Sequence, residues 1–261
     1  MDRDTTSGDL RFALDLADLA DAFTLPRFEQ ADFTLGWKDN RTEVTQADRG
    51  AEQLLADHVL ANRPGQGFFG EEHGLQGNPD SPWRWIVDPI DGTSGFVRGI
   101  PVWATLIALT HAEHEVTVAV VSAPAMKRRW WASRGHGAFA DGKRCHVSDV
   151  SKMAAAQVSI TFNHGWDQLG LTGELVTIQQ QAHRARGFGD FWQHCLVAEG
   201  ALDLAVDAVG VAPYDIASVR LIVEEAGGKF TDRHGNETHD HSTAISSNGL
   251  LHDQVIRRLG V

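Results

Sequence analysis

The sequence predicts a fold of mixed α and β structure in which sheets and helices stack in layers. Near the N-terminus, apolar residues recur at the spacing of a helix face. In the middle of the chain, short apolar runs separated by glycine, proline and charged residues indicate an antiparallel sheet. After about residue 150, strand-like and helix-like runs alternate. We therefore expect one domain over residues 1–261, with an α+β half at 1–150 and an α/β half at 151–261.

Two helices are predicted in the N-terminal part of the chain. The first follows Ser7, a candidate N-cap, and the second begins at Thr45, where the run 45–48 is similar to a capping box. The apolar residues at helical spacing are Leu10, Leu14, Ala17 and Ala20 on the first helix, and Leu54, Leu55 and Val59 on the second.

The other predicted elements are shorter. Helices are expected at 193–199 and 215–226, and Gly227 and Gly228 form a C-cap signal after the later one. The run 135–137, Gly-His-Gly, indicates a hairpin turn rather than a nucleotide-binding loop. Strand-like runs lie at 83–87, 104–109, 116–121 and 129–132, and then at 158–162, 184–188 and 202–206.

The charge of the chain limits its partners. With 35 acidic and 23 basic residues the net charge is -12, which disfavours binding to nucleic acid or to an anionic membrane. Residues 1–10 are polar and acidic, unlike a signal sequence, and no apolar run approaches transmembrane length. The two cysteines, Cys145 and Cys195, do not suggest a disulfide framework. We expect a cytoplasmic protein with neither a nucleic-acid nor a membrane partner.

The run 85–93 ends an apolar strand with two carboxylates and a glycine. Pro89 favours an extended conformation of Asp88, and Asp91 presents a second carboxylate three residues later. The carbonyl of Ile90 lies between them. Oxygen ligands of this kind suit Mg²⁺, Mn²⁺ or Ca²⁺ rather than zinc. A plain Asp/Gly turn after a strand explains the same residues, and this run alone leaves both interpretations open.

Residues around this run extend the candidate site. Gly92 allows a ligand to approach the backbone closely, and Thr93 begins a candidate helix whose free N–H groups attract an anion. Glu71 follows the strand-like residues 67–69, so two neighbouring strand ends would place it beside the first carboxylate. Asp215 starts a predicted helix, where an acidic residue also favours the helix dipole without any other role.

Two other clusters of polar residues are interpreted as structural. His234, His239 and His241 lie among glycine, aspartate and asparagine residues that are typical of a solvated loop rather than of a zinc site. The basic and aromatic run 128–131 fits a strand at an exposed sheet edge or interface better than a nucleic-acid surface, because the chain is acidic.

Three separated motifs carry a resemblance to a known family. They are Gly-Glu-Glu at 70–72, Asp-Pro-Ile-Asp-Gly-Thr at 88–93 and Tyr-Asp-Ile-Ala-Ser at 214–218, followed by Glu-Glu-Ala-Gly-Gly at 224–228. In this order they resemble the inositol monophosphatase family of Mg²⁺-dependent, lithium-sensitive phosphatases. The resemblance spans most of the chain and implies a layered αβαβα sandwich, a small phosphate ester as substrate, and a homodimer.

Within that family, the segments 96–104, 128–132 and 189–191 resemble the bacterial histidinol-phosphate phosphatases. This narrower resemblance implies hydrolysis of L-histidinol phosphate to L-histidinol and phosphate in histidine biosynthesis. The alternatives are the same chemistry on inositol monophosphate or another small phosphate ester, and a catalytically silent regulator that binds metal or phosphate. The complete set of site residues argues against a silent protein: Asp48, Glu71, Asp88, Asp91, Thr93 and Asp215.

The resemblance also implies which residues bind metal. It implies two or three Mg²⁺ ions per site, with Mn²⁺ as a substitute and Li⁺ as an inhibitor. Glu71, Asp88 and the Ile90 carbonyl would bind one ion, and Glu71 would also belong to the catalytic set. Asp88, Asp91 and Asp215 would bind a second ion, so that Asp88 bridges the two.

Further roles are implied for the attacking water and the phosphate. Asp48 and Thr93 match the family positions that orient and help to deprotonate the water, and Asp48 could hold a third, weaker ion. The structural alternative for Asp48 is the cap of the helix that begins at Thr45. Asp91 and the amides of Gly92 and Thr93 would bind the phosphate group.

Substrate choice is expected to depend on other residues. Asp190 and Asp207 fall near the family positions that contact the substrate alcohol, and two carboxylates suit histidinol, which carries an ammonium group and an imidazole. The alternatives are a helix start for Asp190 and a turn for Asp207. Ser94 and Gly95 stand where the family often has larger residues, a departure that bears on the helix start and on metal affinity.

Overall fold

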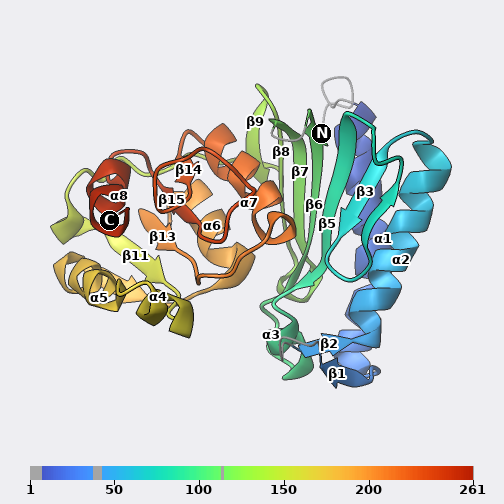
Figure 1. The fold of residues 1–261 in the computed structure, drawn as a ribbon, viewed down its shortest axis with the longest axis horizontal. Coiled ribbons are helices and arrows are strands. Elements are labelled where there is room, and N and C mark those ends of the chain that lie inside the picture. Colours follow the sequence, from blue (N-terminus) through green and yellow to red (C-terminus); the bar gives the residue numbers. More distant parts are fainter. Residues whose placement is uncertain (1–7, 38–42, 113–114, 261) are drawn as a thin grey trace.

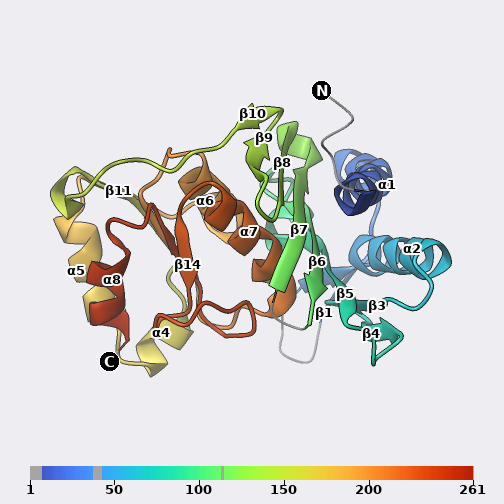
Figure 2. The same ribbon diagram turned by 90° about the horizontal axis from the view of Figure 1, so that it is seen from above.

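The computed structural model describes residues 8–37, 43–112 and 115–260. Across the molecule, a pair of N-terminal helices is followed by a large sheet, two central helices, a smaller sheet and an outer layer of helices (Figure 1). The view from above shows the same succession of layers (Figure 2). The layered αβαβα sandwich implied by the resemblance is confirmed. Ser7, the candidate N-cap, lies outside the described residues.

The first layer consists of α1 (Gly8–Gln30) and α2 (Gln46–Asn62), which cover one face of the large sheet. Thr45 is the N-cap of α2, as predicted, because its hydroxyl oxygen accepts the N–H groups of the first turn. The sequence did not predict the short antiparallel pair β1 (Leu35–Trp37) and β2 (Glu43–Thr45) that precedes α2. The predicted apolar residues Leu10, Leu14, Ala17 and Ala20 of α1 pack in one cluster with side chains of the large sheet.

The large sheet has eight strands among the described residues, in the order β10-β9-β8-β7-β6-β5-β3-β4. Neighbouring strands are antiparallel, as predicted for the middle of the chain, except that β3 runs parallel to β5. The strands are β3 (Gly67–Gly70), β4 (Gly74–Gly77), β5 (Trp83–Asp91), β6 (Ala104–His111), β7 (Glu115–Ala123), β8 (Arg128–Ser133), β9 (Gly137–Ala140) and β10 (Lys143–Arg144).

Two predictions about this sheet are wrong. β5 does not end at residue 87 but continues to Asp91, because a β-bulge accommodates Pro89 where a regular ladder would need its missing N–H group. The run 128–131 does not lie at an exposed edge, since β8 lies between β7 and β9 and both of its tryptophans are buried. The hairpin turn at 135–137 is confirmed by the antiparallel pairing of β8 and β9 on either side of it.

The smaller sheet has five strands in the order β12-β11-β13-β15-β14. It is mixed, since β11 runs parallel to β12 and β13, whereas β15 is antiparallel to β13 and β14. The three strands predicted in this half are present but shorter, and the last two were not predicted. The strands are β11 (Gln157–Ile160), β12 (Arg184–Arg186), β13 (Leu204–Val206), β14 (Lys229–Thr231) and β15 (Ile245–Ser247).

Two helices between the sheets, α6 (Asp190–Ala198) and α7 (Pro213–Glu225), join the layers. Their apolar residues share one buried cluster with side chains from the large sheet, so α7 is central to the core. Both helices were predicted, and both begin a few residues earlier than expected. The remaining helices are the short α3 (Thr93–Val97) after β5, and α4 (His164–Gln168), α5 (Thr172–Gln181) and α8 (His252–Leu259) near the outer face of the smaller sheet.

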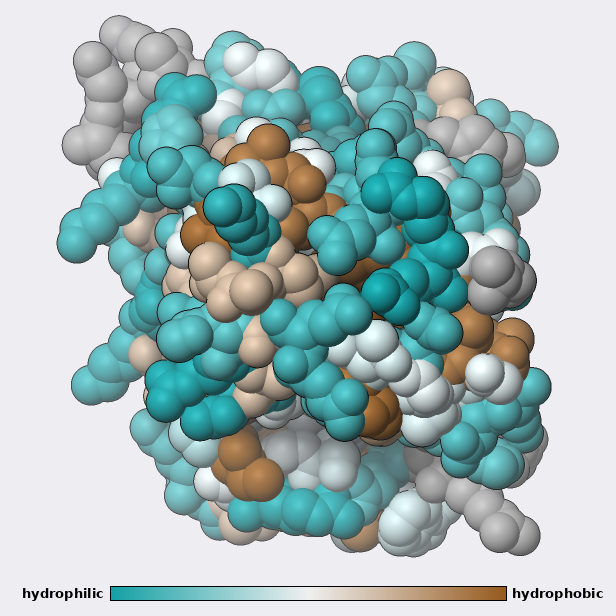
Figure 3. Space-filling view, turned by 90° about the vertical axis from the view of Figure 1, so that its left-hand side faces the viewer, coloured by the Kyte–Doolittle hydropathy of each residue, from teal (hydrophilic) through white to brown (hydrophobic). Residues whose placement is uncertain are grey.

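The surface at the end that carries α5 and α8 is mostly polar, with apolar residues in small separate areas (Figure 3). The segment with three histidines is irregular, as predicted, but not fully solvated, because His239 is buried and His241 pairs with the buried Asp232 at 3.1 Å. In the described part of the chain, no helix is long and apolar enough to cross a membrane.

Candidate functional site

The bulge in β5 brings two carboxylates to one side of the strand. Side chains alternate between the faces of a regular strand, so residues three apart point in opposite directions. The β6 partners of Asp88 and Asp91 are only two residues apart, at positions 106 and 104, so β5 contains one extra residue here. The Oδ1 atom of Asp88 accepts the N–H of Ile90 at 2.9 Å, which fixes the turn of the chain. A local irregularity therefore creates the carboxylate pair.

The turn that follows the bulge requires a glycine. Gly92 has a φ of 84°, and a Cβ there would lie 3.0 Å from a backbone carbonyl and 3.4 Å from the carboxylate of Asp190. Thr93 then begins α3, and its hydroxyl lies 3.0 Å from both the Oδ1 atom of Asp48 and the carbonyl oxygen of Ile90. One hydroxyl has one proton, so Thr93 donates to one of these acceptors at a time.

Asp48 both caps a helix and lies in the candidate site, where it contacts Thr93. Its Oδ2 atom accepts the backbone N–H of Thr45 at 2.8 Å in a capping box, while its Oδ1 atom faces Thr93. The side chain is fully buried, and that burial raises the pKa of Asp48 above its usual value although bonds from Thr45 oppose the shift. The two interpretations of Asp48 therefore describe different oxygens of one carboxylate.

Glu71 reaches the site because β3 and β5 are parallel. Gly70, the last residue of β3, lies opposite Val87, so Glu71 follows at the same sheet edge as Asp88. After burial, the charge of Glu71 is the largest cause of the raised pKa of Asp88. The expectation that two neighbouring strand ends bring these carboxylates together agrees with this register.

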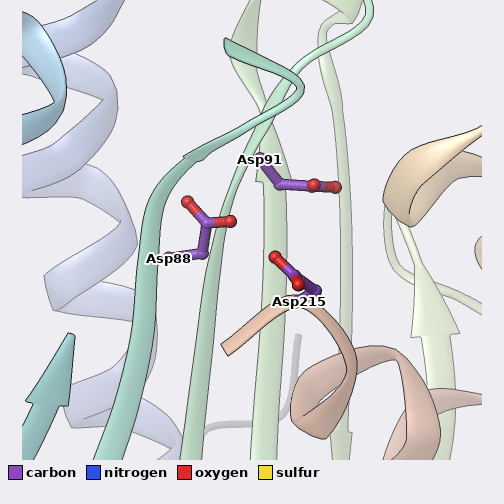
Figure 4. Close-up of side chains that lie close together, drawn as sticks. All are labelled: Asp88, Asp91 and Asp215. Carbon is purple, nitrogen blue, oxygen red and sulfur yellow. The ribbon is translucent and has the colours of Figure 1, made fainter. Parts of the chain in front are cut away.

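Asp215 completes the cluster from the other side. It lies in the first turn of α7, where its Oδ2 atom accepts the N–H of Ala212 at 2.6 Å. Asp88, Asp91 and Asp215 each offer a carboxylate oxygen, and these oxygens lie within 4.8 Å of one another. Figure 4 shows the three side chains converging from β5 and α7.

Burial and mutual repulsion disfavour the charged forms of these carboxylates. Burial, followed by the neighbouring carboxylates, raises the pKa values of Asp88 and Asp91 well above their usual range. Burial and the charges of Glu71, Asp207 and Asp190 raise the pKa of Asp215 to about 7, against the bond from its own helix start. A divalent cation would remove this repulsion, and a donor set of carboxylate and carbonyl oxygens fits a hard cation such as Mg²⁺.

Comparison with known proteins identifies the family. A model of the inositol monophosphatase family matches residues 11–260. The chain belongs to the inositol monophosphatase family. It is 46% identical over 257 residues to histidinol-phosphatase of Mycobacterium tuberculosis, covering 96% of this chain and 97% of that protein. It is 42% identical over 256 residues to histidinol-phosphatase of Streptomyces coelicolor, covering 95% of each chain.

Among solved structures, the extragenic suppressor protein suhB from Bartonella henselae superimposes with a TM-score of 0.89. The sequences are 28% identical, and the superposition covers 97% of this chain and 98% of that chain. The layered architecture of our chain is therefore also found in an experimentally determined structure.

The structure gives a physical setting for Ser94 and Gly95, which we expect to be smaller than the residues that the family often has at these positions. A Cβ at Gly95 would lie 2.9 Å from the carbonyl oxygen of Val102, so a larger side chain requires a backbone shift there. The Ser94 hydroxyl accepts a bond from Arg98 at 2.7 Å, and Arg98 also pairs with Glu43 at 2.8 Å. Both departures therefore concern the anchoring of α3 rather than the carboxylate cluster.

A second group of residues faces the cluster from α6 and β13. Asp190 begins α6 with a φ of 49°, and the N–H of Phe191 donates to Asp91 at 2.7 Å. Although Asp190 is exposed, desolvation of its carboxyl group and then the charge of Asp207 raise its pKa to about 6. Asp207 follows β13, and its Oδ2 atom lies 3.1 Å from the Nε2 atom of His194. The predicted substrate residues thus lie near the cluster.

Two further buried residues of this region, Glu52 and His194, were not predicted from the sequence. Glu52 is four residues after Asp48 on α2, and its carboxylate accepts N–H groups from the segment that carries Glu71. His194 is four residues after Asp190 on α6, and its Nδ1 atom lies 2.8 Å from the Ser246 hydroxyl. Residues four apart share one helix face, so the spacing from a predicted site residue was a usable signal.

Proposed function

We propose that this protein is a Mg²⁺-dependent phosphatase that hydrolyses L-histidinol phosphate to L-histidinol and phosphate, a reaction of histidine biosynthesis. The cluster of Asp88, Asp91 and Asp215, in which Asp88 is buried, is the observation that carries the metal-dependent chemistry. The substrate assignment rests on the two similar relatives named histidinol-phosphatase and on the acidic residues opposite the cluster. A catalytically silent regulator would not require this complete set of residues.

The proposed metal ligands follow from the positions of the carboxylates. Glu71, Asp88 and the Ile90 carbonyl would hold one Mg²⁺ ion, and Asp88 would share the second ion with Asp91 and Asp215. When bound, the cations neutralise the phosphate ester and acidify a water molecule. Mn²⁺ would substitute for Mg²⁺, and Li⁺ would inhibit. Asp91 and the amides of Gly92 and Thr93 would position the phosphate group.

Asp48 and Thr93 are proposed to accept a proton from the attacking water. With its own proton directed to the Oδ1 atom of Asp48, the Thr93 oxygen is free to accept a hydrogen bond from the water. The water proton can then pass through the Thr93 oxygen to Asp48. Because burial raises the pKa of Asp48, its carboxylate is a stronger base than an exposed aspartate, so the transfer is favoured. Asp48 would also hold a third, weaker ion.

Asp190 and Asp207 are proposed to bind the cationic part of histidinol. Their carboxylates can form charge-assisted hydrogen bonds with an ammonium group or an imidazolium. Asp207 already bonds with the N–H of Ala208 at 2.7 Å and with His194, so its orientation is fixed before the substrate arrives. Inositol phosphate has no cationic group and would gain nothing from these two charges.

The setting of the reaction is part of the same proposal. We propose a single phosphatase domain over residues 1–261, with halves at 1–150 and 151–261, that works in the cytoplasm as a homodimer. A small phosphate ester would be its partner molecule, without nucleic acid or membrane.

Phosphate release tests the proposed function most directly. Purified protein would be assayed with Mg²⁺ on L-histidinol phosphate, inositol 1-phosphate, fructose 1,6-bisphosphate and an adenosine bisphosphate, and again with a chelator. We expect kcat/KM for histidinol phosphate to be at least roughly 100-fold higher than for the others, because those esters offer no cationic group to the carboxylates of Asp190 and Asp207. Preference for the inositol ester would overturn the substrate assignment. Absence of metal-dependent release from every ester would favour the regulator.

A further inference from the structure

Glu52 is a fully buried acidic residue on α2, one helical turn after Asp48. Its carboxylate faces the segment between β3 and β4. The Oε2 atom accepts the backbone N–H of Glu72 at 2.7 Å, and the Oε1 atom accepts the backbone N–H of His73 at 2.7 Å. The Nδ1 atom of the His73 ring lies 2.9 Å from the same Oε1 atom. A single carboxylate therefore fastens this turn to α2.

The space around this carboxylate confirms that the fit is close. A Cβ added at Gly70 would overlap the carboxyl group of Glu52, so β3 can end against α2 only with a glycine at this position. Gly70 has no positive φ, and hence backbone conformation alone does not require glycine there. The contact with Glu52 is the reason for the small residue.

Glu71 lies between two residues, Gly70 and Glu72, whose backbone contacts the carboxylate of Glu52. Gly70 packs on the carboxyl group from one side, and the N–H of Glu72 is bonded to it from the other. The backbone on both sides of Glu71 is thus fixed relative to α2, which also carries Asp48. The parallel pairing of Gly70 with Val87 also fixes the backbone next to Glu71 relative to Asp88.

We infer that Glu52 is a positioning residue for the metal site: it holds the turn at 70–73 so that the carboxylate of Glu71 faces Asp88 before a cation binds. This inference rests on the proposed function, in which Glu71 and Asp88 share an ion. Residues that orient metal ligands commonly change metal affinity by about 10–100-fold when they are replaced. Glu52 touches neither the substrate nor the reacting atoms in this scheme.

The test uses Glu52→Gln, which keeps the size of the side chain. Each carboxylate oxygen of Glu52 accepts a backbone N–H group, so the NH₂ group of glutamine must oppose one of these two donors. A matched control is Glu225→Gln. Glu225 accepts the N–H groups of Gly135 and Gly137, each at 2.8 Å, and it also fastens a turn. It follows Asp215 by ten residues on α7, which is roughly 15 Å along the helix.

Two readouts are measured for the metal-free wild type and both variants: calorimetric titration with Mn²⁺, and the Mg²⁺ concentration for half-maximal phosphate release. For Glu52→Gln we expect the Mn²⁺ dissociation constant and the half-maximal Mg²⁺ concentration to rise about tenfold or more. At saturating Mg²⁺, kcat should stay within about threefold of wild type, since the reacting groups are unchanged. For Glu225→Gln, only the unfolding temperature should fall.

The outcomes separate the two proposals. If the wild type binds no Mn²⁺, the proposed function fails. If the wild type binds Mn²⁺ and Glu52→Gln binds it as tightly as Glu225→Gln does, the positioning role is wrong. Should Glu52→Gln not fold, Gly70→Ala replaces it, because the added methyl group displaces the Glu52 carboxylate. Unchanged Mn²⁺ affinity in folded Gly70→Ala would equally overturn the inference.

Discussion

The two sides of the candidate site are built in different ways. The β5 wall, defined here as Asp88, Ile90, Asp91, Gly92 and Thr93, comes from six consecutive positions of one strand and the turn after it. The α6 wall, defined as Asp190, His194 and Asp207, combines one face of a helix with the end of β13. The β5 wall depends on a bulge and a glycine turn, so its side chains are tied to an irregular backbone. In the α6 wall, His194 lies inside a regular helix and Asp207 follows a regular strand, so these side chains can change without altering such a turn. We therefore expect chemistry to depend on the β5 wall and substrate choice on the α6 wall.

The largest effect is expected for Asp88→Asn. The amide has nearly the same shape but loses the charge that both proposed ions share, so kcat/KM should fall by about 1000-fold or more. The metal-free variant should unfold at the same or a higher temperature than wild type, because one of the mutually repelling buried carboxylates is gone. Phosphate release and thermal unfolding measure the two effects.

Asp203→Asn is the matched control for this variant. Asp203 is a buried carboxylate beside β13 that accepts the N–H of Gln157 at 2.6 Å, away from the site. It should lower the unfolding temperature and leave kcat/KM near wild type. Activity of Asp88→Asn within about tenfold of wild type would contradict a bridging carboxylate.

Thr93→Val should produce the next largest effect. Valine keeps the shape of threonine but removes the hydroxyl that links the water to Asp48, so kcat should fall about 100-fold. The half-maximal Mg²⁺ concentration should change little, because no carboxylate is lost. Thr117→Val removes a hydroxyl bond to a strand carbonyl of the large sheet and serves as the control. A kcat equal to that of the control would exclude Thr93 from the proton path.

Asp190→Asn tests the α6 wall. Loss of one charge should raise KM for L-histidinol phosphate about tenfold, the usual order for a hydrogen bond to a charged group. Turnover of inositol 1-phosphate should stay within about twofold, because that ester presents no cation. Asp141→Asn, an exposed aspartate in the turn between β9 and β10, is the control. Equal losses for both substrates would assign Asp190 to the chemistry and remove the distinction between the walls.

The smallest effect on activity is expected outside both walls, at His252 of α8. Its ring nitrogens lie 2.8 Å from the Thr231 hydroxyl and 2.9 Å from the Ser247 hydroxyl. Burial, and then the charge of Lys229, lower the pKa of His252 from 6.5 to about 4. The unfolded chain therefore binds a proton below pH 6.5 that the folded protein takes up only near pH 4. The free energy of unfolding should fall by up to roughly 3 kcal/mol across this window as the pH is lowered.

Urea unfolding at several pH values measures this effect. In His252→Asn the slope of unfolding free energy against pH should be shallower between pH 6.5 and pH 4, since the titrating group is gone. The kcat of the folded variant at neutral pH should match wild type. Equal slopes would show that His252 is not the group responsible, and a large loss of kcat would extend the α6 side of the site into α8.

The β5 wall was largely predictable from sequence because its residues are local. The order Asp-Pro-Ile-Asp-Gly-Thr contains the proline, the second carboxylate and the glycine that make the bulge and turn. The continuation of β5 through this run was not predicted, because a proline usually ends a strand and only the pairing with β6 reveals the bulge. The parallel pairing of β3 with β5 likewise depends on tertiary contacts that no local pattern contains.

The α6 wall was predictable only in part. Asp190 and Asp207 were selected as single residues by resemblance, whereas the bond from His194 to Asp207 joins two segments that meet only in the folded protein. Glu52 was missed for the same reason, since its partners lie about twenty residues later in the chain. The short strands β14 and β15 carry too few residues for a clear alternation of apolar and polar positions.

The central position of α7 has a consequence for synthesis of the chain. α7 starts at Pro213, 80 residues after Ser133 ends β8, yet its apolar side chains complete the core on one face of the large sheet. At ribosomal rates of about 5–20 residues per second, α7 is synthesised roughly 4–16 s after β8, and until then this face of the sheet is not covered by α7. During this interval the sheet exposes an apolar surface, which can bind chaperones and can promote aggregation. The first half of the chain is therefore expected to depend on the last third for its solubility as well as for its fifth carboxylate, Asp215.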